Sequence, residues 1–132
     1  MNYTQNLHLP QFAETDRIHH DDFNTAFAAI DTAVAGKSGV AFGAYNGDGT
    51  AERTITLGFT PKIVYLCTRW GLAGNHSGDG YCYGGLVERD HPIVHRSQNC
   101  AEIVNGGFVV RTPNGFTRMN SQSEVYYYVA IV

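Results

Sequence analysis

The spacing of the hydrophobic residues changes at Gly36 and divides the chain into two parts. Residues 1–19 show no strong period, and Pro10 interrupts any regular element there, so we expect an extended arm. A helical period follows over residues 22–35. From Val40 onward, short apolar segments separated by Gly, Asn and Asp recur at roughly ten-residue intervals, which is typical of a β-sandwich or barrel.

The predicted helix has recognisable ends and one apolar stripe. Asp21 or Asp22 can cap its N-terminus, and Gly36 provides a stop. The stripe is narrow, of the a/d type, and its spacings are four, three and four: Phe23, Phe27, Ile30 and Val34. Such a stripe packs either on the β domain of its own chain or on copies of itself. Two heptads are too few for an independent coiled coil, so the β domain would have to contribute to any assembly.

The second part alternates in the way that half-buried strands do. After the segment 40–45, Asn46-Gly47-Asp48-Gly49 predicts a hairpin turn, because Asn, Asp and Gly tolerate positive φ. Residues 52–59 place apolar side chains on one face and threonines on the other. A second hairpin is predicted at residues 105–107, Asn-Gly-Gly.

Two segments are apolar on both faces, which favours central positions in a sheet. They are residues 62–70 and the closing segment 125–132. We therefore predict a mainly β protein: an antiparallel β-sandwich over residues 37–132, preceded over residues 1–36 by an extended N-terminal arm and one short α-helix. No second β domain and no internal repeat is apparent.

Composition narrows the classes of partner. The 132-residue chain has a net charge of −3, only 16% charged residues and no run of Lys or Arg. Clustered cations are needed to bind phosphates, so we expect no nucleic acid and no anionic membrane as partner. The longest apolar run, residues 125–132, is too short to span a bilayer, so we expect no membrane insertion.

The cysteines and the first residues predict the compartment of synthesis. Cys67, Cys82 and Cys100 form neither a paired framework nor a zinc motif, so we interpret them as reduced core thiols. The start of the chain shows neither a basic nor an apolar region of a signal peptide. We expect synthesis in a reducing bacterial cytoplasm.

Catalytic and metal motifs are weak. No serine lies in a G-x-S-x-G turn. His91 and His95 would stand about 13 Å apart on a strand, too far for one ion. The run 19–22, His-His-Asp-Asp, is better explained by helix capping. We expect no catalytic residue, no metal and no cofactor. Two alternatives stay open: a carboxylate pair that meets only in space, and a histidine repeated around a trimer axis.

One loop has the composition of a sugar-binding site. An aromatic ring covers the apolar face of a sugar, while amides and carboxylates bind its hydroxyls. The only tryptophan precedes a Gly-rich loop, and the candidate ligand-binding residues are Trp70, Asn75, His76, Asp79, Tyr81 and Tyr83. The alternative interpretation is that Trp70 anchors the core and the loop is an ordinary solvated connection. A second polar region, residues 89–99, is expected to form a solvated rim.

Several stretches resemble bacteriophage or prophage tail proteins. The first part resembles the start of tail-fibre and baseplate proteins in Asn6-Leu7-His8-Leu9-Pro10 and Asp22-Phe23-Asn24. The second part resembles the C-terminal β domain of tail fibres, first in Gly43-Ala44-Tyr45-Asn46-Gly47-Asp48-Gly49-Thr50 and then in the corner Leu57-Gly58-Phe59-Thr60-Pro61-Lys62. The end of the chain, residues 126–131, resembles that domain's closing strand. Residues 68–105 resemble nothing that we can name.

The resemblance implies a virion tail protein with a structural, non-catalytic role. It implies a homotrimer that associates with other tail proteins and binds a host cell-surface glycan, with the helix residues Phe23, Phe27, Ile30 and Val34 as the oligomer interface. Tail fibres are usually longer and carry shaft repeats, which this chain lacks. The alternatives are a virion adaptor or decoration protein without a ligand, and a monomeric carbohydrate-binding module or small hydrolase.

Overall fold

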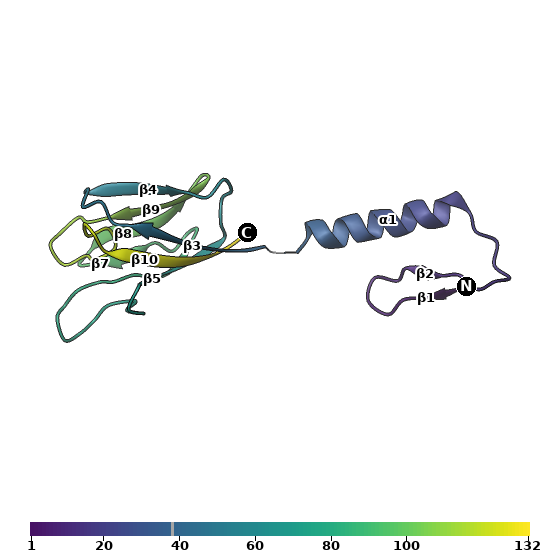
Figure 1. Ribbon diagram of the computed structural model, residues 1–132, viewed down its shortest axis with the longest axis horizontal. Coiled ribbons are helices and arrows are strands. Elements are labelled where there is room, and N and C mark those ends of the chain that lie inside the picture. Colours follow the sequence, from purple (N-terminus) through teal and green to yellow (C-terminus); the bar gives the residue numbers. More distant parts are fainter. Residues whose placement is uncertain (38) are drawn as a thin grey trace. The chain divides into compact units, whose positions relative to one another are not determined.

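A computed structural model describes residues 1–37 and 39–132 (Figure 1). Two compact units make up the chain, Met1–Ser38 and Gly39–Val132. The first unit contains β1 (Asn2–Tyr3), β2 (Pro10–Gln11) and α1 (His20–Ala35). The second contains β3 (Val40–Asn46), β4 (Glu52–Thr56), β5 (Ile63–Thr68), β6 (Gly85–Glu88), β7 (Ile93–His95), β8 (Gln98–Val104), β9 (Gly107–Arg111) and β10 (Val125–Ile131). Within the described residues, no helix is long and apolar enough to cross a membrane.

The arm folds back on itself rather than staying extended. β1 and β2 pair in antiparallel register, and the Thr4 N–H donates to the Leu9 carbonyl at 2.8 Å. The rings of Tyr3 and His8 stack with centroids 4.3 Å apart, which closes the small hairpin. A groove of about 330 Å³ lies between this hairpin and the side of α1 that carries Ala26 and Ala29.

The helix α1 begins two residues earlier than predicted, because its cap is built differently. His19 is the N-cap residue, and the Asp22 carboxylate reaches back to accept its N–H at 3.1 Å. An acidic residue thus stabilises the helix start from inside the first turn. At the other end Gly36 stays right-handed, with φ −79°, and its N–H donates to the Thr32 carbonyl at 3.0 Å.

The second unit is an antiparallel sandwich, as the sequence predicts. One sheet has the strand order β3-β10-β5-β6 and the other the order β4-β9-β8-β7. Every pairing within these sheets is antiparallel. The two segments predicted to be central do take inner positions: β10 lies between β3 and β5, and β5 lies between β10 and β6.

The core lies between the inner faces of the two sheets. Tyr45 of β3 and Tyr126 of β10 stack with centroids 5.1 Å apart, and Phe108 of β9 meets Tyr45 edge to face. Cys82 and Cys100 are buried there as predicted, whereas Cys67 is only half-buried. Other fully enclosed apolar side chains are Pro61, Val64, Leu66, Val87, Ala101, Val110, Met119 and Ala130.

Of the two predicted hairpins, one is confirmed and one is wrong. Residues 105–107 join β8 and β9, which pair directly. Residues 46–49 do not join paired strands, since β3 pairs with β10 and β4 pairs with β9. This segment instead carries the chain from one sheet to the other. Of these four residues only Gly49 adopts a positive φ, +75°, and the strand partners come from distant parts of the sequence.

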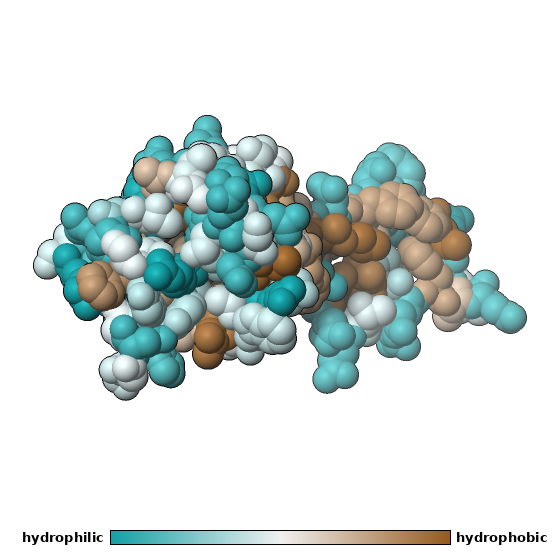
Figure 2. Space-filling view, turned by 60° about the vertical axis from the view of Figure 1, so that its left-hand side comes forward, coloured by the Kyte–Doolittle hydropathy of each residue, from teal (hydrophilic) through white to brown (hydrophobic). Residues whose placement is uncertain are grey.

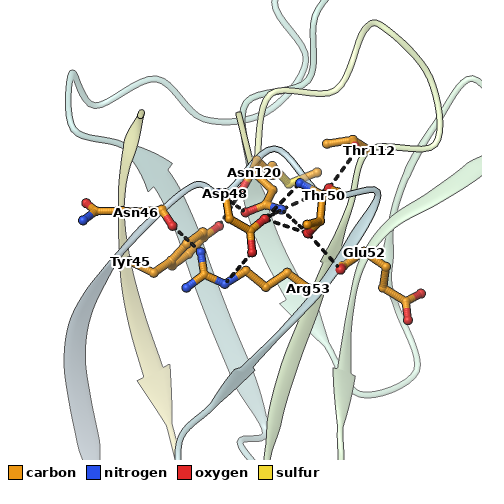
Figure 3. Close-up of polar contacts among 9 residues, drawn as sticks. Tyr45, Asn46, Asp48, Thr50, Glu52, Arg53, Thr112 and Asn120 are labelled. Atoms are coloured by element: carbon orange, nitrogen blue, oxygen red, sulfur yellow. Dashed lines mark hydrogen bonds and ion pairs between the residues drawn. The ribbon is translucent and has the colours of Figure 1, made fainter. Parts of the chain in front are cut away.

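A polar network holds this crossing in place (Figure 3). The buried side chain of Asn120 donates to Asp48 Oδ1 at 2.7 Å and to the Thr50 carbonyl at 3.1 Å, and its Oδ1 accepts the Asp48 N–H at 3.2 Å. Gly47 lies so close to the Ser121 carbonyl that any Cβ would collide with it. The glycines and Asp48 of the segment therefore serve a long-range contact rather than a hairpin.

Candidate functional site

The turn after β5 projects the only tryptophan outward. The Gly71 N–H donates to the Thr68 carbonyl at 2.9 Å, and the Thr68 N–H donates to the Leu72 carbonyl at 2.9 Å. Gly71 has φ +80°, a conformation that glycine adopts without strain. Because the chain reverses here within a few residues, the side chain of Trp70 is left outside the sandwich.

Trp70 is 70% exposed, so the interpretation of this residue as a core anchor is wrong. The Arg69 guanidinium lies 4.2 Å from the centre of its ring. A cation over one face of the indole is a favourable contact, and it restricts the motion of both side chains. A large, orientated aromatic surface is therefore offered to solvent.

The rest of the loop forms a small ladder of its own. The Tyr83 N–H donates to the Gly74 carbonyl at 3.0 Å, and the His76 N–H donates to the Tyr81 carbonyl at 2.8 Å. Asn75 makes an isolated antiparallel bridge to Cys82. Backbone hydrogen bonds within the loop therefore hold it together, and they fix the backbone positions of Tyr81 and Tyr83.

Asp79 organises this ladder. Its carboxylate accepts the Tyr83 hydroxyl at 2.7 Å and the Tyr81 N–H at 2.9 Å, and it lies 3.3 Å from His76 Nδ1. The hydrogen bond from Tyr83 is the main cause that lowers the pKa of Asp79, and the same bond raises the pKa of Tyr83. Asp79 therefore remains an ionised acceptor that holds Tyr83 in position.

A pocket of about 520 Å³ opens between this loop and the segment that leads into β10. Its lining residues are Thr68, Trp70, Leu72, Tyr83, Arg118, Ser121, Gln122, Glu124 and Tyr126. Two of the six predicted ligand-binding residues, Trp70 and Tyr83, line it. The other four, Asn75, His76, Asp79 and Tyr81, do not line the pocket, and Asp79 acts on it through Tyr83.

The opposite wall of the pocket is formed by residues that the sequence does not predict. Arg118 places its guanidinium 4.2 Å from the Tyr81 ring centre and donates to the Gly115 carbonyl at 3.1 Å. Gln122 and Glu124 add an amide and a carboxylate to the same pocket. No local pattern marks these residues, because only the fold brings them beside Trp70.

The helix carries the second candidate surface. The four stripe residues Phe23, Phe27, Ile30 and Val34, which we call the helix seam, are 40%, 62%, 37% and 63% exposed. Phe12 from the arm packs against one end of the seam, where the centres of the Phe12 and Phe23 rings are 5.5 Å apart. Figure 2 shows brown, hydrophobic side chains gathered on the N-terminal unit, whereas the visible face of the C-terminal unit is mostly teal and white.

Comparisons with known proteins place the chain in no family. No protein-family model matches it, and neither a curated protein nor a solved structure does so. The function must therefore be argued from the residues. The geometry described above offers an aromatic surface, a cation, a carboxylate and an amide around one pocket, which are the components of a binding site for a polar ligand with an apolar face.

Proposed function

We propose that this chain is a phage or prophage tail structural protein that attaches the virion to a host cell-surface glycan as a homotrimer. The observation that carries the binding role is Trp70, an exposed indole at the rim of a pocket with polar walls. The tail assignment is supported by the resemblance of residues 6–10, 43–50 and 57–62 to tail proteins. In this role the chain catalyses no reaction, needs no cofactor and binds other proteins of the tail.

The chemistry of the pocket suits a saccharide. The indole of Trp70 would cover the apolar face of a sugar ring. The Glu124 carboxylate and the Gln122 amide would bind its hydroxyls, and the Arg118 guanidinium would donate to ring or substituent oxygens. Each contact is weak in water, so one pocket gives a low affinity.

A trimer would make such weak sites useful. When three pockets are joined, binding of the first raises the effective concentration of the others, so avidity exceeds the affinity of one site by orders of magnitude. The exposed helix seam supports this assembly, because its a/d spacing is that of a bundle of like helices. Position in the virion tail would then present several pockets to the same cell.

The proposal predicts that Trp70→Ala weakens binding to a glycan array or to host cells by at least about tenfold, the effect of losing roughly 1.4 kcal/mol. Trp70 is exposed, so the variant keeps the core intact. A matched control, Tyr3→Ala, removes a half-exposed aromatic ring from the other unit and should leave binding unchanged. Binding is measured on immobilised glycans and on cells.

The wild-type protein separates the alternatives. If it binds no glycan and no cell, the pocket has no attachment role and a virion adaptor or decoration protein becomes the better assignment. If it binds sugars as a monomer, the chain is better described as a carbohydrate-binding module. If Trp70→Ala binds as well as the wild type, the pocket is the wrong site.

A further inference from the structure

The outer face of the β3-β10-β5-β6 sheet is apolar across all four strands. Alternation along each strand and the register between strands place one set of side chains on this face. We call its apolar part the apolar sheet face: Val40, Phe42, Ala44, Ile63, Tyr65, Cys67, Leu86, Val125, Tyr127, Val129 and Ile131; the polar residues Asn46 and Glu88 lie at its margins. Its central row crosses the sheet as Phe42–Val129–Tyr65–Leu86. Phe42 is 78% exposed and Leu86 is 55% exposed.

The other sheet shows what a solvated outer face looks like in the same sandwich. There Thr54 and Thr56 alternate with the buried Ile55. Arg111 on the neighbouring strand pairs with Glu52 at 2.6 Å and with Glu102 at 2.5 Å. By contrast, within the described strands of the β3-β10-β5-β6 sheet, the one charged residue on the outer face is Glu88, which lies on the edge strand β6. The outer face of the β4-β9-β8-β7 sheet is therefore polar, as expected of a solvated surface, whereas the outer face of the other sheet is apolar.

The size of the apolar sheet face suits a protein interface. Four strands about 4.8 Å apart, each rising about 3.3 Å per residue, give a projected area of roughly 400 Å². The largest apolar patch on a typical monomer is about 300–600 Å² and is often functional, so a patch of this size is a reasonable place to look for an interface. A standard interface uses about 800 Å² on each partner, so the face supplies roughly half. The helix seam, about 17 Å long from Phe23 to Val34, adds more.

The covalent chain ties the two apolar surfaces together. Only residues 36–39 separate α1 from β3, and this connection can span at most about 17 Å. If the seams of several copies form a parallel bundle, each β3 begins within that distance of the end of its own helix. Phe42 is the third residue of β3, so the connection is short enough to keep the apolar sheet faces of the copies within reach of one another.

We propose that the apolar sheet face is buried between copies of this chain. The proposal rests on the homotrimer proposed above and identifies the part of the β domain that would hold it together. The narrow a/d form of the seam favours copies over the chain's own sheet, because a helix that packs on a sheet normally presents a wider apolar stripe. The absence of opposing charges across most of the face suits self-association, since like surfaces meet without repulsion.

A native cysteine reports on this surface. Cys67 lies on the apolar sheet face next to Tyr127 and is half-buried, whereas Cys82 and Cys100 are enclosed in the core. If copies cover the face, a thiol reagent such as a maleimide labels no cysteine of the native oligomer. When the oligomer is broken without unfolding, the reagent should label one cysteine per chain.

The test uses the full chain and three single variants. Phe42→Asp and Leu86→Asp each place a charge on the apolar sheet face at an exposed position. Thr54→Asp places the same charge on the solvated face of the other sheet. Light scattering after size exclusion should give about three times 14.5 kDa for the wild type and for Thr54→Asp. Phe42→Asp and Leu86→Asp should raise the dissociation constant at least about tenfold and expose Cys67 to labelling.

Each other result overturns the proposal or one part of the function. If the wild type is a monomer and Cys67 is protected from labelling, the chain's own helix covers the apolar sheet face. If it is a monomer and Cys67 is labelled, the face is not covered by copies of the chain. An oligomer that survives both face variants is held by another surface. Glycan binding by such a monomer or oligomer would leave the attachment role standing while the proposed interface fails. If the wild type forms the oligomer through the apolar sheet face but binds no glycan, the proposed interface stands and the attachment role fails.

Discussion

At the scale of single residues, Asp48 shows how one carboxylate serves a turn and a long-range contact together. Its Oδ1 accepts the Thr50 hydroxyl at 2.6 Å, the Thr50 N–H at 2.9 Å and the Asn120 amide at 2.7 Å, while Arg53 lies 3.6 Å from Oδ2. These hydrogen bonds, chiefly those from Thr50, lower the pKa of Asp48 from 3.8 to about 2. The folded state therefore favours the ionised form.

This lowered pKa predicts a pH-dependent stability difference between the wild type and Asp48→Asn. The carboxylate stabilises the folded state fully above about pH 4, and this contribution is lost as the pH falls from about 4 to about 2. Asp48→Asn should therefore be less stable than the wild type at pH 7, with a difference that shrinks towards pH 2. Urea unfolding at several pH values measures it.

The control for this prediction is Asp90→Asn, which removes an exposed carboxylate from the turn between β6 and β7. Its stability relative to the wild type should not follow the same pH course. A constant deficit of Asp48→Asn across the whole range would contradict the argument, because it would show that shape and not charge is responsible.

At the scale of elements, α1 is a helix with a well-built start and an uncovered stripe. The bond from the His19 N–H to Asp22 satisfies one of the free donors at its N-terminus. Among the described residues, none in α1 is buried. Since packing of an apolar face provides most of the stability of a short helix, α1 is expected to gain stability when its seam is covered.

Phe23→Asp combined with Ile30→Asp should therefore convert the proposed trimer into monomers. A bundle of seams would bury these charges without partners, which is strongly unfavourable. Light scattering measures the mass, and circular dichroism checks that the sandwich stays folded. The matched pair Asn24→Asp with Ala28→Asp adds the same charge away from the stripe and should leave the mass unchanged. An unchanged mass for the seam pair would show that the helix is not an interface.

At the scale of the whole sandwich, Asn120 joins two connections that the chain reaches far apart. One connection links β3 to β4 and the other links β9 to β10. Asn120 is fully buried. Its side-chain amide donates to Asp48 and Thr50, and its backbone carbonyl accepts the Gly49 N–H at 2.9 Å. Hydrogen bonds of Asn120 thus join the two connections that cross between the sheets, in addition to the packing of the hydrophobic core.

Asn120→Ala is predicted to destabilise the protein by about 2 kcal/mol, because Asp48 and Thr50 lose a buried partner and a small void remains. Thermal or urea unfolding measures the change. Asn46→Ala, at an exposed position of β3, is the matched control and should change stability by less than about 0.5 kcal/mol. Equal effects of the two substitutions would contradict the importance assigned to the network.

The sequence predicts those parts of this fold that depend on neighbours along the chain. Alternation identified β4 through Ile55 and its flanking threonines, and Asn105-Gly106 identified the hairpin between β8 and β9. The segment Asn46–Gly49 was misassigned because a crossing between sheets uses the same turn residues as a hairpin. Which strand lies opposite is decided by contacts between residues more than seventy positions apart, such as the hydrogen bond from the Tyr45 hydroxyl to the Met119 carbonyl.

The candidate site follows the same division. The loop with Trp70 and Tyr83 was found because aromatic and polar residues are close in the sequence. Arg118, Gln122 and Glu124 were not, because they reach the pocket only after β10 has been placed beside β5. The exposure of Trp70 was also undecidable from the sequence, since it depends on the reversal at Gly71.

The inner position of β10 has a consequence for biosynthesis. β3 and β5 both pair with β10, so neither inner edge of the sheet is satisfied until residues 125–131 have been translated. Until then the nascent chain presents two open strand edges and a cluster of aromatic residues without their partner, a state prone to pairing with other chains. The β3-β10-β5-β6 sheet can therefore close only after β10 has been translated, so this sheet cannot form strand by strand in the order of synthesis.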